Sequence, residues 1–192
     1  SNYRASISYL NRQGVILGNK MDRLNARLTF HQKAVNEKLN ITVTGALTQR
    51  DYSPAFTGSF DLAYNMLPVY PIKNADGSWF DILQSDMGNP VRNMTLNKQN
   101  NKNSLYYLNA RGDLDVVSGL RLSISGLKER EANDFGQYLH SETTSGRASQ
   151  GLAQRSNWTR DKQLLELTAA YEKAMGNHNL NFLAGYSYEE NL

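Results

Sequence analysis

The sequence feature that most constrains the fold is a strict two-residue alternation of apolar and polar side chains. In "RLNARLTF" (residues 23–30), Leu24, Ala26, Leu28 and Phe30 alternate with two arginines, an asparagine and a threonine. Successive side chains of a β-strand point to opposite faces of the sheet, so the pattern predicts a strand with one apolar face. The same alternation occurs in seven stretches: 3–9, 23–30, 39–48, 106–116, 120–127, 165–172 and 180–189.

Charge separates the two faces of these stretches. No position of the seven apolar sets is charged, whereas every alternate set except that of 39–48 carries an Arg, Asp or Glu. This asymmetry fits a barrel whose outer face meets lipid and whose inner face lines a polar lumen. It also fits a soluble β-sandwich, in which the apolar face meets a second sheet.

The lengths of the connections favour the barrel. Residues 31–38, 117–119 and 174–179 are short turns, whereas 11–22, 49–105 and 128–164 are long, and the two kinds alternate along the chain. Transmembrane barrels have tight periplasmic turns and long extracellular loops, and a sandwich gives no reason for such sorting. We therefore predict an all-β fold of about seven antiparallel up-and-down strands, with extracellular-type loops at about 49–105 and 128–164.

Composition narrows the function classes. No run approaches the roughly 18 apolar residues of a transmembrane helix. The chain of 192 residues has no cysteine, and its net charge is only +3 with lysines and arginines spread among carboxylates, so we expect no nucleic-acid partner. An odd number of strands cannot close a bacterial barrel, and an open edge is not tolerated in lipid. We therefore expect residues 1–192 to be a contiguous part of a larger barrel.

Several segments resemble a known family. "NYRASISYLNRQGVI" (2–16), "MDRLNARLTFHQKAVNEKLNITV" (21–43), "PVYPIKNADGSWFD" (68–81) and the Asn-Pro pair at 89–90 are similar to the barrel of SusC/RagA-type TonB-linked outer-membrane proteins. The resemblance covers about residues 2–91 and continues as generic barrel strands to the end.

The resemblance implies a TonB-dependent importer of glycans or peptides in the outer membrane of Bacteroidota. Such an importer has a 22-stranded barrel filled by a plug, and pairs with a SusD-like surface lipoprotein that acts as a lid. We find no plug, no TonB box and no closing strand in this sequence, so coupling to TonB is expected through the missing plug region. The expected partners are the lipoprotein, a glycan or peptide substrate, and outer-membrane lipid.

The sequence offers little for catalysis. His31, His140 and His178 are far apart without metal-ligand spacing, and we predict no catalytic residue, metal site or cofactor. Carboxylates such as Asp113 and Asp115, or Glu166 and Glu172, fall on the predicted lumen face, where pairing across the lumen with Arg111 or Arg121 is favoured over a role in a barrel enzyme.

Binding is better supported than catalysis. The loop around 52–103 concentrates aromatic side chains beside polar ones, and a connection of this length is usually functional or disordered. The candidate contacts to a ligand or partner are Tyr70, Trp79, Phe80, Asp81 and, from the second predicted loop, Trp158. The alternatives are that these side chains only pack the loop against itself, and that the chain is a soluble all-β ligand-binding or adhesion domain.

Overall fold

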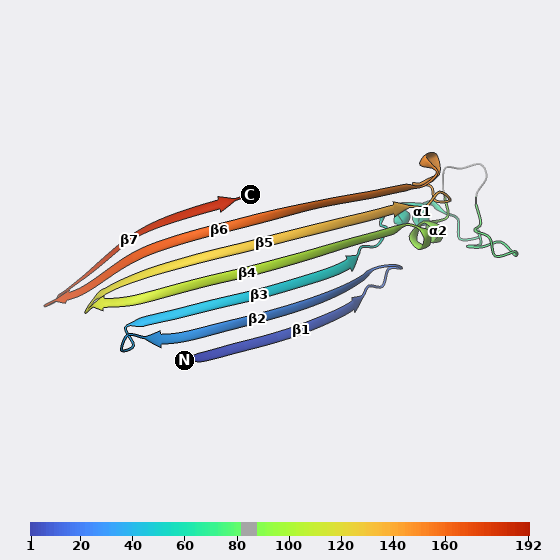
Figure 1. Cartoon of the computed structure of the whole chain (residues 1–192). Coiled ribbons are helices and arrows are strands. Elements are labelled where there is room, and N and C mark those ends of the chain that lie inside the picture. The colour runs from blue at the N-terminus through green and yellow to red at the C-terminus, as the bar shows by residue number, and fades with distance from the viewer. Residues whose placement is uncertain (82–87) are drawn as a thin grey trace.

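The computed structural model describes residues 1–81 and 88–192, in which seven antiparallel strands form one sheet in sequence order (Figure 1). The predicted all-β, up-and-down architecture is confirmed. The strands are β1 (Asn2–Gln13), β2 (Lys20–Ala34), β3 (Leu39–Ser53), β4 (Lys98–Val117), β5 (Leu120–Leu139), β6 (Leu152–Met175) and β7 (His178–Asn191). Two short helices, α1 (Gly58–Asn65) and α2 (Pro90–Leu96), lie in the connection between β3 and β4.

The predicted sorting of connections is found in part: the first connection, predicted as the long segment 11–22, is only residues 14–19, because β1 and β2 extend into it. The turns after β2, β4 and β6 lie at one end of the sheet, and the longer connections lie at the other (Figure 1). The tight turns need left-handed backbone: Val35, Asn36 and Glu37 have φ of 53°, 51° and 67°, and Gly119 has φ of 85°. A Cβ on Gly119 would overlap the Glu172 carbonyl oxygen. Both the left-handed backbone and this close contact therefore exclude a side chain at this position.

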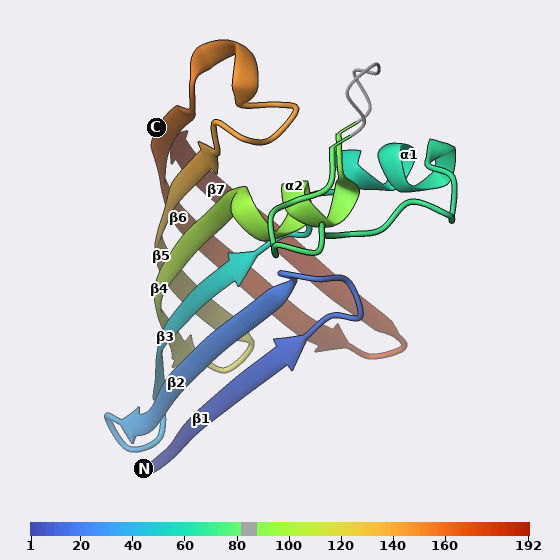
Figure 2. The ribbon, with the colours of Figure 1, turned by 90° about the vertical axis from the view of Figure 1, so that its right-hand side faces the viewer.

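The strand register places all seven apolar sets on one face. Ala5 lies opposite Leu28, Leu28 opposite Gly45, and Gly45 opposite Leu108, and the pattern continues to β7. The alternate sets form polar contacts on the other face, such as the bonds of Asn25 with Ser8 at 3.1 Å and with Thr48 at 3.0 Å. The sheet curves into a trough, with the long β3–β4 connection over its concave side (Figure 2).

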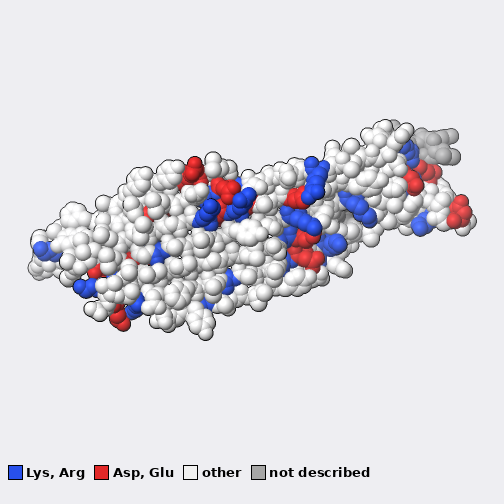
Figure 3. Space-filling model, viewed as in Figure 1, with Lys and Arg blue, Asp and Glu red and all other residues white. Residues whose placement is uncertain are grey.

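The apolar face is largely solvent-exposed in the isolated chain. Ile7 is 76% exposed and Leu28 is 55% exposed, although both are large and apolar. Viewed from the convex side, charged side chains gather over the middle and loop end of the sheet, and a mostly uncharged area lies between them and the turns (Figure 3). We call this uncharged area the apolar band. Its members are the outward residues of 3–9 in β1, 24–30 in β2, 39–47 in β3, 106–114 in β4, 120–126 in β5, 165–171 in β6 and 180–188 in β7.

The apolar band runs obliquely across the hydrogen-bonded rows of the sheet. Its centre is at Ser6 in β1 and at Ala184 in β7, but the row through Ser6 reaches β7 at Asn191, seven residues further on. Seven residues are about 23 Å along a strand, and six steps between strands are about 29 Å. The band is therefore level only if the strands tilt by about 40°, within the roughly 35–45° tilt of transmembrane barrels.

Four strands, β3 to β6, continue well beyond the apolar band at the loop end, which corrects the predicted loop limits. Most of 128–164 belongs to β5 and β6, and only 140–151 connects them; the first long connection is 54–97, not 49–105. The extensions are polar on both faces, with Lys128, Arg130 and Asp161 on the outward one, so no alternation marks them as strands. Hydrophobic periodicity reports only the part of a strand that has one apolar face.

Close packing is concentrated in the long connections rather than in the sheet. Ala55 and Pro90 are buried apolar residues, and the buried polar ones are Ser59, Asn89, Arg92, Asn93, Asn97 and Thr143. All lie between β3 and β4 or between β5 and β6. In the described part of the chain, no helix is long and apolar enough to cross a membrane.

The assignment of faces predicts an asymmetry between neighbouring residues of β2. In the full-length protein, Ala26→Arg puts a charge near the middle of the apolar band and should cost about 2–4 kcal/mol in lipid. Asn25→Arg puts the same side chain on the polar face and loses only local hydrogen bonds. We expect the first variant to lower the amount of folded protein in the membrane fraction far more than the second; equal tolerance would show that the faces are reversed.

Candidate functional site

The two long connections meet at the loop end of the sheet through buried polar contacts. Asn97, which follows α2, accepts hydrogen bonds at Oδ1 from the His140 backbone N–H and the Thr143 hydroxyl, both at 2.9 Å. The Asn93 side-chain amide makes two hydrogen bonds of 3.3 Å with Thr144: its nitrogen donates to the Thr144 hydroxyl, and its oxygen accepts from the Thr144 backbone N–H. Thr143 is fully buried and Asn97 is 4% exposed. These contacts join residues more than 40 positions apart, and we call the joined connections the loop assembly.

The loop assembly is organised around the start of α2. Asn89 is its N-cap, and its side-chain oxygen accepts from the N–H groups of Val91 at 3.0 Å and Arg92 at 3.1 Å. Pro90 occupies the first helical position, where its fixed φ suits the helix and no N–H is needed. The Asn89 amide also donates to the carbonyl oxygens of Ile72 at 2.7 Å and Phe80 at 3.3 Å. The buried Asn89 side chain, 2% exposed, thus caps the start of α2 and also holds the backbone of Ile72 and Phe80 against it.

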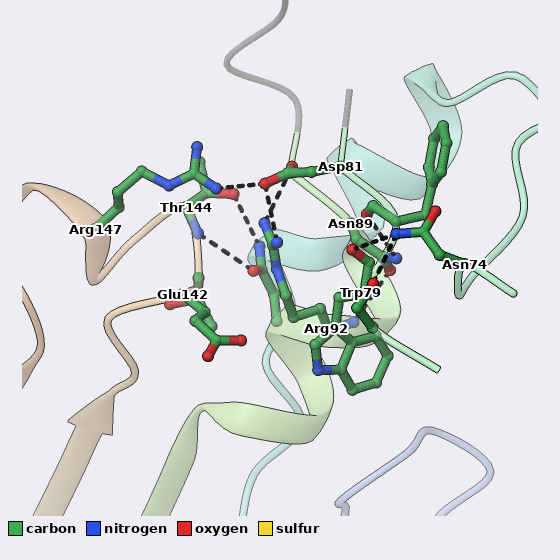
Figure 4. A network of polar contacts seen from close by, with 12 residues as sticks. Asn74, Trp79, Asp81, Asn89, Arg92, Glu142, Thr144 and Arg147 are labelled. Carbon is green, nitrogen blue, oxygen red and sulfur yellow. Dashed lines mark hydrogen bonds and ion pairs between the residues drawn. The ribbon is translucent and has the colours of Figure 1, made fainter. Parts of the chain in front are cut away.

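Asp81 joins the two connections electrostatically (Figure 4). Both its oxygens accept from the Arg92 guanidinium, at 3.0 and 3.3 Å, and one also accepts from Arg147 of the second connection at 2.6 Å. Partial burial opposes ionisation of the carboxyl group, but the hydrogen bonds from Arg92 and Arg147 outweigh it and hold the pKa of Asp81 below its ordinary value. In the Asp81–Arg92 ion pair, the Arg92 side chain is buried, at 4% exposed, whereas the Asp81 side chain is only partly buried.

The predicted aromatic candidates of the first connection pack against neighbours within it. The rings of Tyr70 and Phe80 stack with centroids 5.5 Å apart. Trp79 pairs with Lys73 by backbone and by a cation–π contact of 4.8 Å. The structure therefore brings four of the predicted candidates into the same connection. Each of them contacts another residue of the loop assembly, by ring stacking, a cation–π contact or an ion pair; the four are Tyr70, Trp79, Phe80 and Asp81. Packing of the loop explains their positions without a ligand.

Trp158 lies elsewhere. It is part of β6, opposite Asn133 of β5, and not in a loop. Its position belongs to the polar, concave face, together with Arg160, which bonds Glu131 at 2.6 Å. Glu131 also accepts from Asn103 of β4 at 2.9 Å. Trp158 is 46% exposed, so its ring is available beside a ready set of hydrogen-bonding groups.

Asp113 and Asp115 of the concave face are paired, but not across the lumen, whereas Glu166 and Glu172 form no ion pair with a described residue. Asp113 bonds Arg111 of its own strand at 2.8–3.0 Å and Ser123 of β5 at 2.6 Å. Asp115 bonds Arg121 of the neighbouring strand at 2.7 Å. The expected partners are right, but the pairs form within the sheet because neighbouring strands bring them together. Among the described residues, no three His, Cys, Asp or Glu side chains gather as metal ligands.

Sequence reasoning missed the residues that hold the loop assembly together. Asn89 carried a usable signal, because Asn followed by Pro is a typical helix start. Asn97, Thr143 and Arg147 carried none, since their roles depend on contacts between segments distant in sequence.

Comparisons with known proteins agree with this geometry. No family model matches the chain. A curated relative, "TonB-dependent receptor P3" of Formosa agariphila, is 25% identical over 99% of the chain. The solved RagAB peptide importer in its closed-closed state superposes with a TM-score of 0.76 at 17% identity over 98% of the chain. A second structure, of the RagAB peptide transporter, gives 0.72 at 15% identity and the same coverage.

The fold is therefore that of a segment of a large β-barrel. The chain is similar in sequence to part of a TonB-dependent receptor and similar in fold to part of the RagAB barrel, as the sequence resemblance predicted. It spans 20% of the length of the curated relative and 22% of each of the RagAB chains.

Removing the charge of Asp81 should loosen the loop assembly. In the full-length receptor, Asp81→Asn leaves the buried Arg92 without its anionic partner, and we expect a local destabilisation of about 2 kcal/mol or more. Amide hydrogen exchange should rise in 54–81, 88–97 and 140–151 but not in the strands. Asp76→Asn is the matched control, because Asp76 bonds only Ser78 in an exposed turn. Unchanged exchange in the Asp81 variant would show that the ion pairs do not hold the connections.

The same carboxyl group predicts a dependence on pH. The pKa of Asp81 is lowered by folding, so its contribution to stability is complete above the unfolded value of about 4 and is lost as the pH falls through the folded value. Hydrogen exchange in the loop assembly should therefore accelerate below about pH 4, relative to the intrinsic exchange rate. The Asp81→Asn variant should lack this acceleration of hydrogen exchange at low pH. An acceleration of equal size in the variant would show that a titrating group other than Asp81 causes it.

Proposed function

We propose that this chain forms part of the wall of an outer-membrane importer that is energised through TonB and closed by a SusD-like lipoprotein. Glycans or peptides are the proposed cargo. Support comes from the relatives, one named a TonB-dependent receptor and the other a peptide importer. No enzymatic step is proposed.

The observation that carries the proposal is the oblique apolar band. A sheet whose outer face carries a charge-free band, level at a strand tilt of about 40°, matches the requirements of a bilayer. A soluble β-sandwich would cover that face with a second sheet. In the described residues all seven strands lie in a single sheet, and the large apolar side chains of the convex face remain exposed.

The concave face supplies suitable chemistry for a polar cargo. Asn103, Glu131 and Arg160 present amide, carboxylate and guanidinium groups beside the exposed face of Trp158. Aromatic rings stack on sugar rings or pack on peptide side chains, while such polar groups bond hydroxyls or backbone amides. This cluster is the proposed cargo contact on the barrel wall.

The loop assembly is the proposed docking surface for the lipoprotein. It lies at the end of the sheet that the long connections define as extracellular, over the concave side (Figure 2). Its internal ion pairs and stacked rings make it a pre-formed surface, and a pre-formed surface loses less entropy on binding. Tyr70, Trp79, Phe80 and Asp81 act in this proposal mainly by holding its shape.

The test is uptake by cells that depend on the full-length receptor. Wild-type cells should take up a panel of labelled oligosaccharides and peptides only when TonB is present, and the receptor should fractionate with the outer membrane. Trp158→Ala should reduce uptake of the accepted cargo by roughly 5- to 10-fold, the loss of one good aromatic contact, at an unchanged receptor level. Phe182→Ala, an aromatic truncation on the convex face, is the control and should leave uptake unchanged. Uptake that is independent of TonB, or a receptor found in the soluble fraction, would overturn the proposal.

A further inference from the structure

A groove crosses the convex face within the apolar band and ends at two basic side chains. Two neighbouring rows of the sheet form it. One passes from Ala5 through Leu28, Gly45 and Leu108 to Lys128, and the other from Ile7 through Ala26, Leu47 and Tyr106 to Arg130. The hollow has a volume of about 720 Å³.

Small residues make the groove. Gly45 lies on its floor, and a Cβ built there would meet nothing within 4 Å. Ala5 and Ala26 lie beside it in the register, while Leu28 and Leu108 flank Gly45 in its own row. The surrounding side chains are apolar, so the site has the shape and character to take a hydrocarbon chain.

The basic end of the groove carries spare positive charge. Lys128 is exposed and, in the described part of the chain, enters no ion pair; the Arg130–Asp161 distance is long, at 3.9 Å. Further along the outer face, Arg155 is held by Asp134 at 2.6 Å, whereas Lys102 and Asp51 form a pair at 3.8 Å that is as loose as that of Arg130 and Asp161. Among the described residues, Lys128 is thus the cation at this level without a carboxylate partner, and Arg130 beside it is only loosely paired.

The orientation of the groove matches that of a lipid. With the strands tilted by about 40°, the row from Ala5 to Lys128 climbs from within the apolar band to its extracellular boundary. Four steps between strands make it about 19 Å long, of which about 12 Å is rise, comparable to half of the roughly 25 Å apolar belt of a barrel. An acyl chain would therefore lie at the apolar end and a headgroup at the basic end.

We propose that this groove is a binding site for a lipid of the surrounding bilayer whose headgroup carries phosphate. Lys and Arg at a membrane surface attract anionic headgroups, and a guanidinium beside an ammonium suits the oxygens of a phosphate. The inference rests on the membrane placement under the proposed function, but not on the cargo or on TonB.

The experiment is native mass spectrometry of the detergent-solubilised full-length receptor with two probes. Phosphatidic acid and diacylglycerol of the same acyl chains differ only in the phosphate. Wild-type receptor should retain phosphatidic acid well above diacylglycerol. The double variant Lys128→Gln/Arg130→Gln should lose roughly 10-fold or more of that retention, and Lys173→Gln, which removes a charge at the turn end of the same face, should lose none.

A second variant tests the apolar end. Gly45→Leu fills the groove without meeting another atom on its Cβ, so it should fold and reduce retention of phosphatidic acid while leaving Lys128 and Arg130 in place. Equal retention of the two probes by wild-type receptor, or full retention by the double variant, would overturn the proposal. A receptor that binds the lipid but fails in uptake contradicts the proposed function alone, so the two failures are distinguishable.

Discussion

The exclusion of charge from one face of the sheet is the constraint on which the rest of this structure depends. Within the apolar band a single Arg or Lys costs on the order of 2–4 kcal/mol in lipid, so each outward position is limited to apolar or small residues. The inward positions are free to carry Arg23, Arg27 and their hydrogen-bonding neighbours. Because side chains alternate strictly, a register slip of one residue would exchange the two faces. The apolar set thus fixes register, curvature and tilt together.

The loop assembly depends on a different interaction. It leaves much of its apolar surface exposed, and its closest packing is around Asn89, Asn93, Asn97 and Thr143. Each of these makes hydrogen bonds to backbone or side-chain groups of another segment, and such bonds are directional. A polar core of this kind defines one geometry, because a buried group left without a partner costs about 1–3 kcal/mol. The connections can therefore hold a defined shape outside the membrane without a hydrophobic core.

The sequence predicted the sheet well and the loop assembly poorly, for a physical reason. All seven strands and the sorting of their connections follow from alternation, which records a local, repeated environment. The strand extensions around Lys128 to Leu139 escaped detection because water lies on both of their sides. Asp81 was predicted as a binding residue, which stays a prediction; its contacts with Arg92 and Arg147 could not be read from the sequence, since only the folded chain brings Arg147 next to a residue 66 positions earlier.

The stretch "KERE" (128–131) shows how one strand serves two environments just above the apolar band. Lys128 and Arg130 project outward, while Glu129 and Glu131 project inward, where Glu131 bonds Arg160 and Asn103. Strict alternation separates the two signs by face: the cations lie on the convex face and the carboxylates on the concave face. A random mixture of the same four residues would neutralise itself on each face. The arrangement instead leaves a positive outer rim beside the apolar band and a paired, hydrogen-bonding inner wall, so the two faces interact with different partners at the same height.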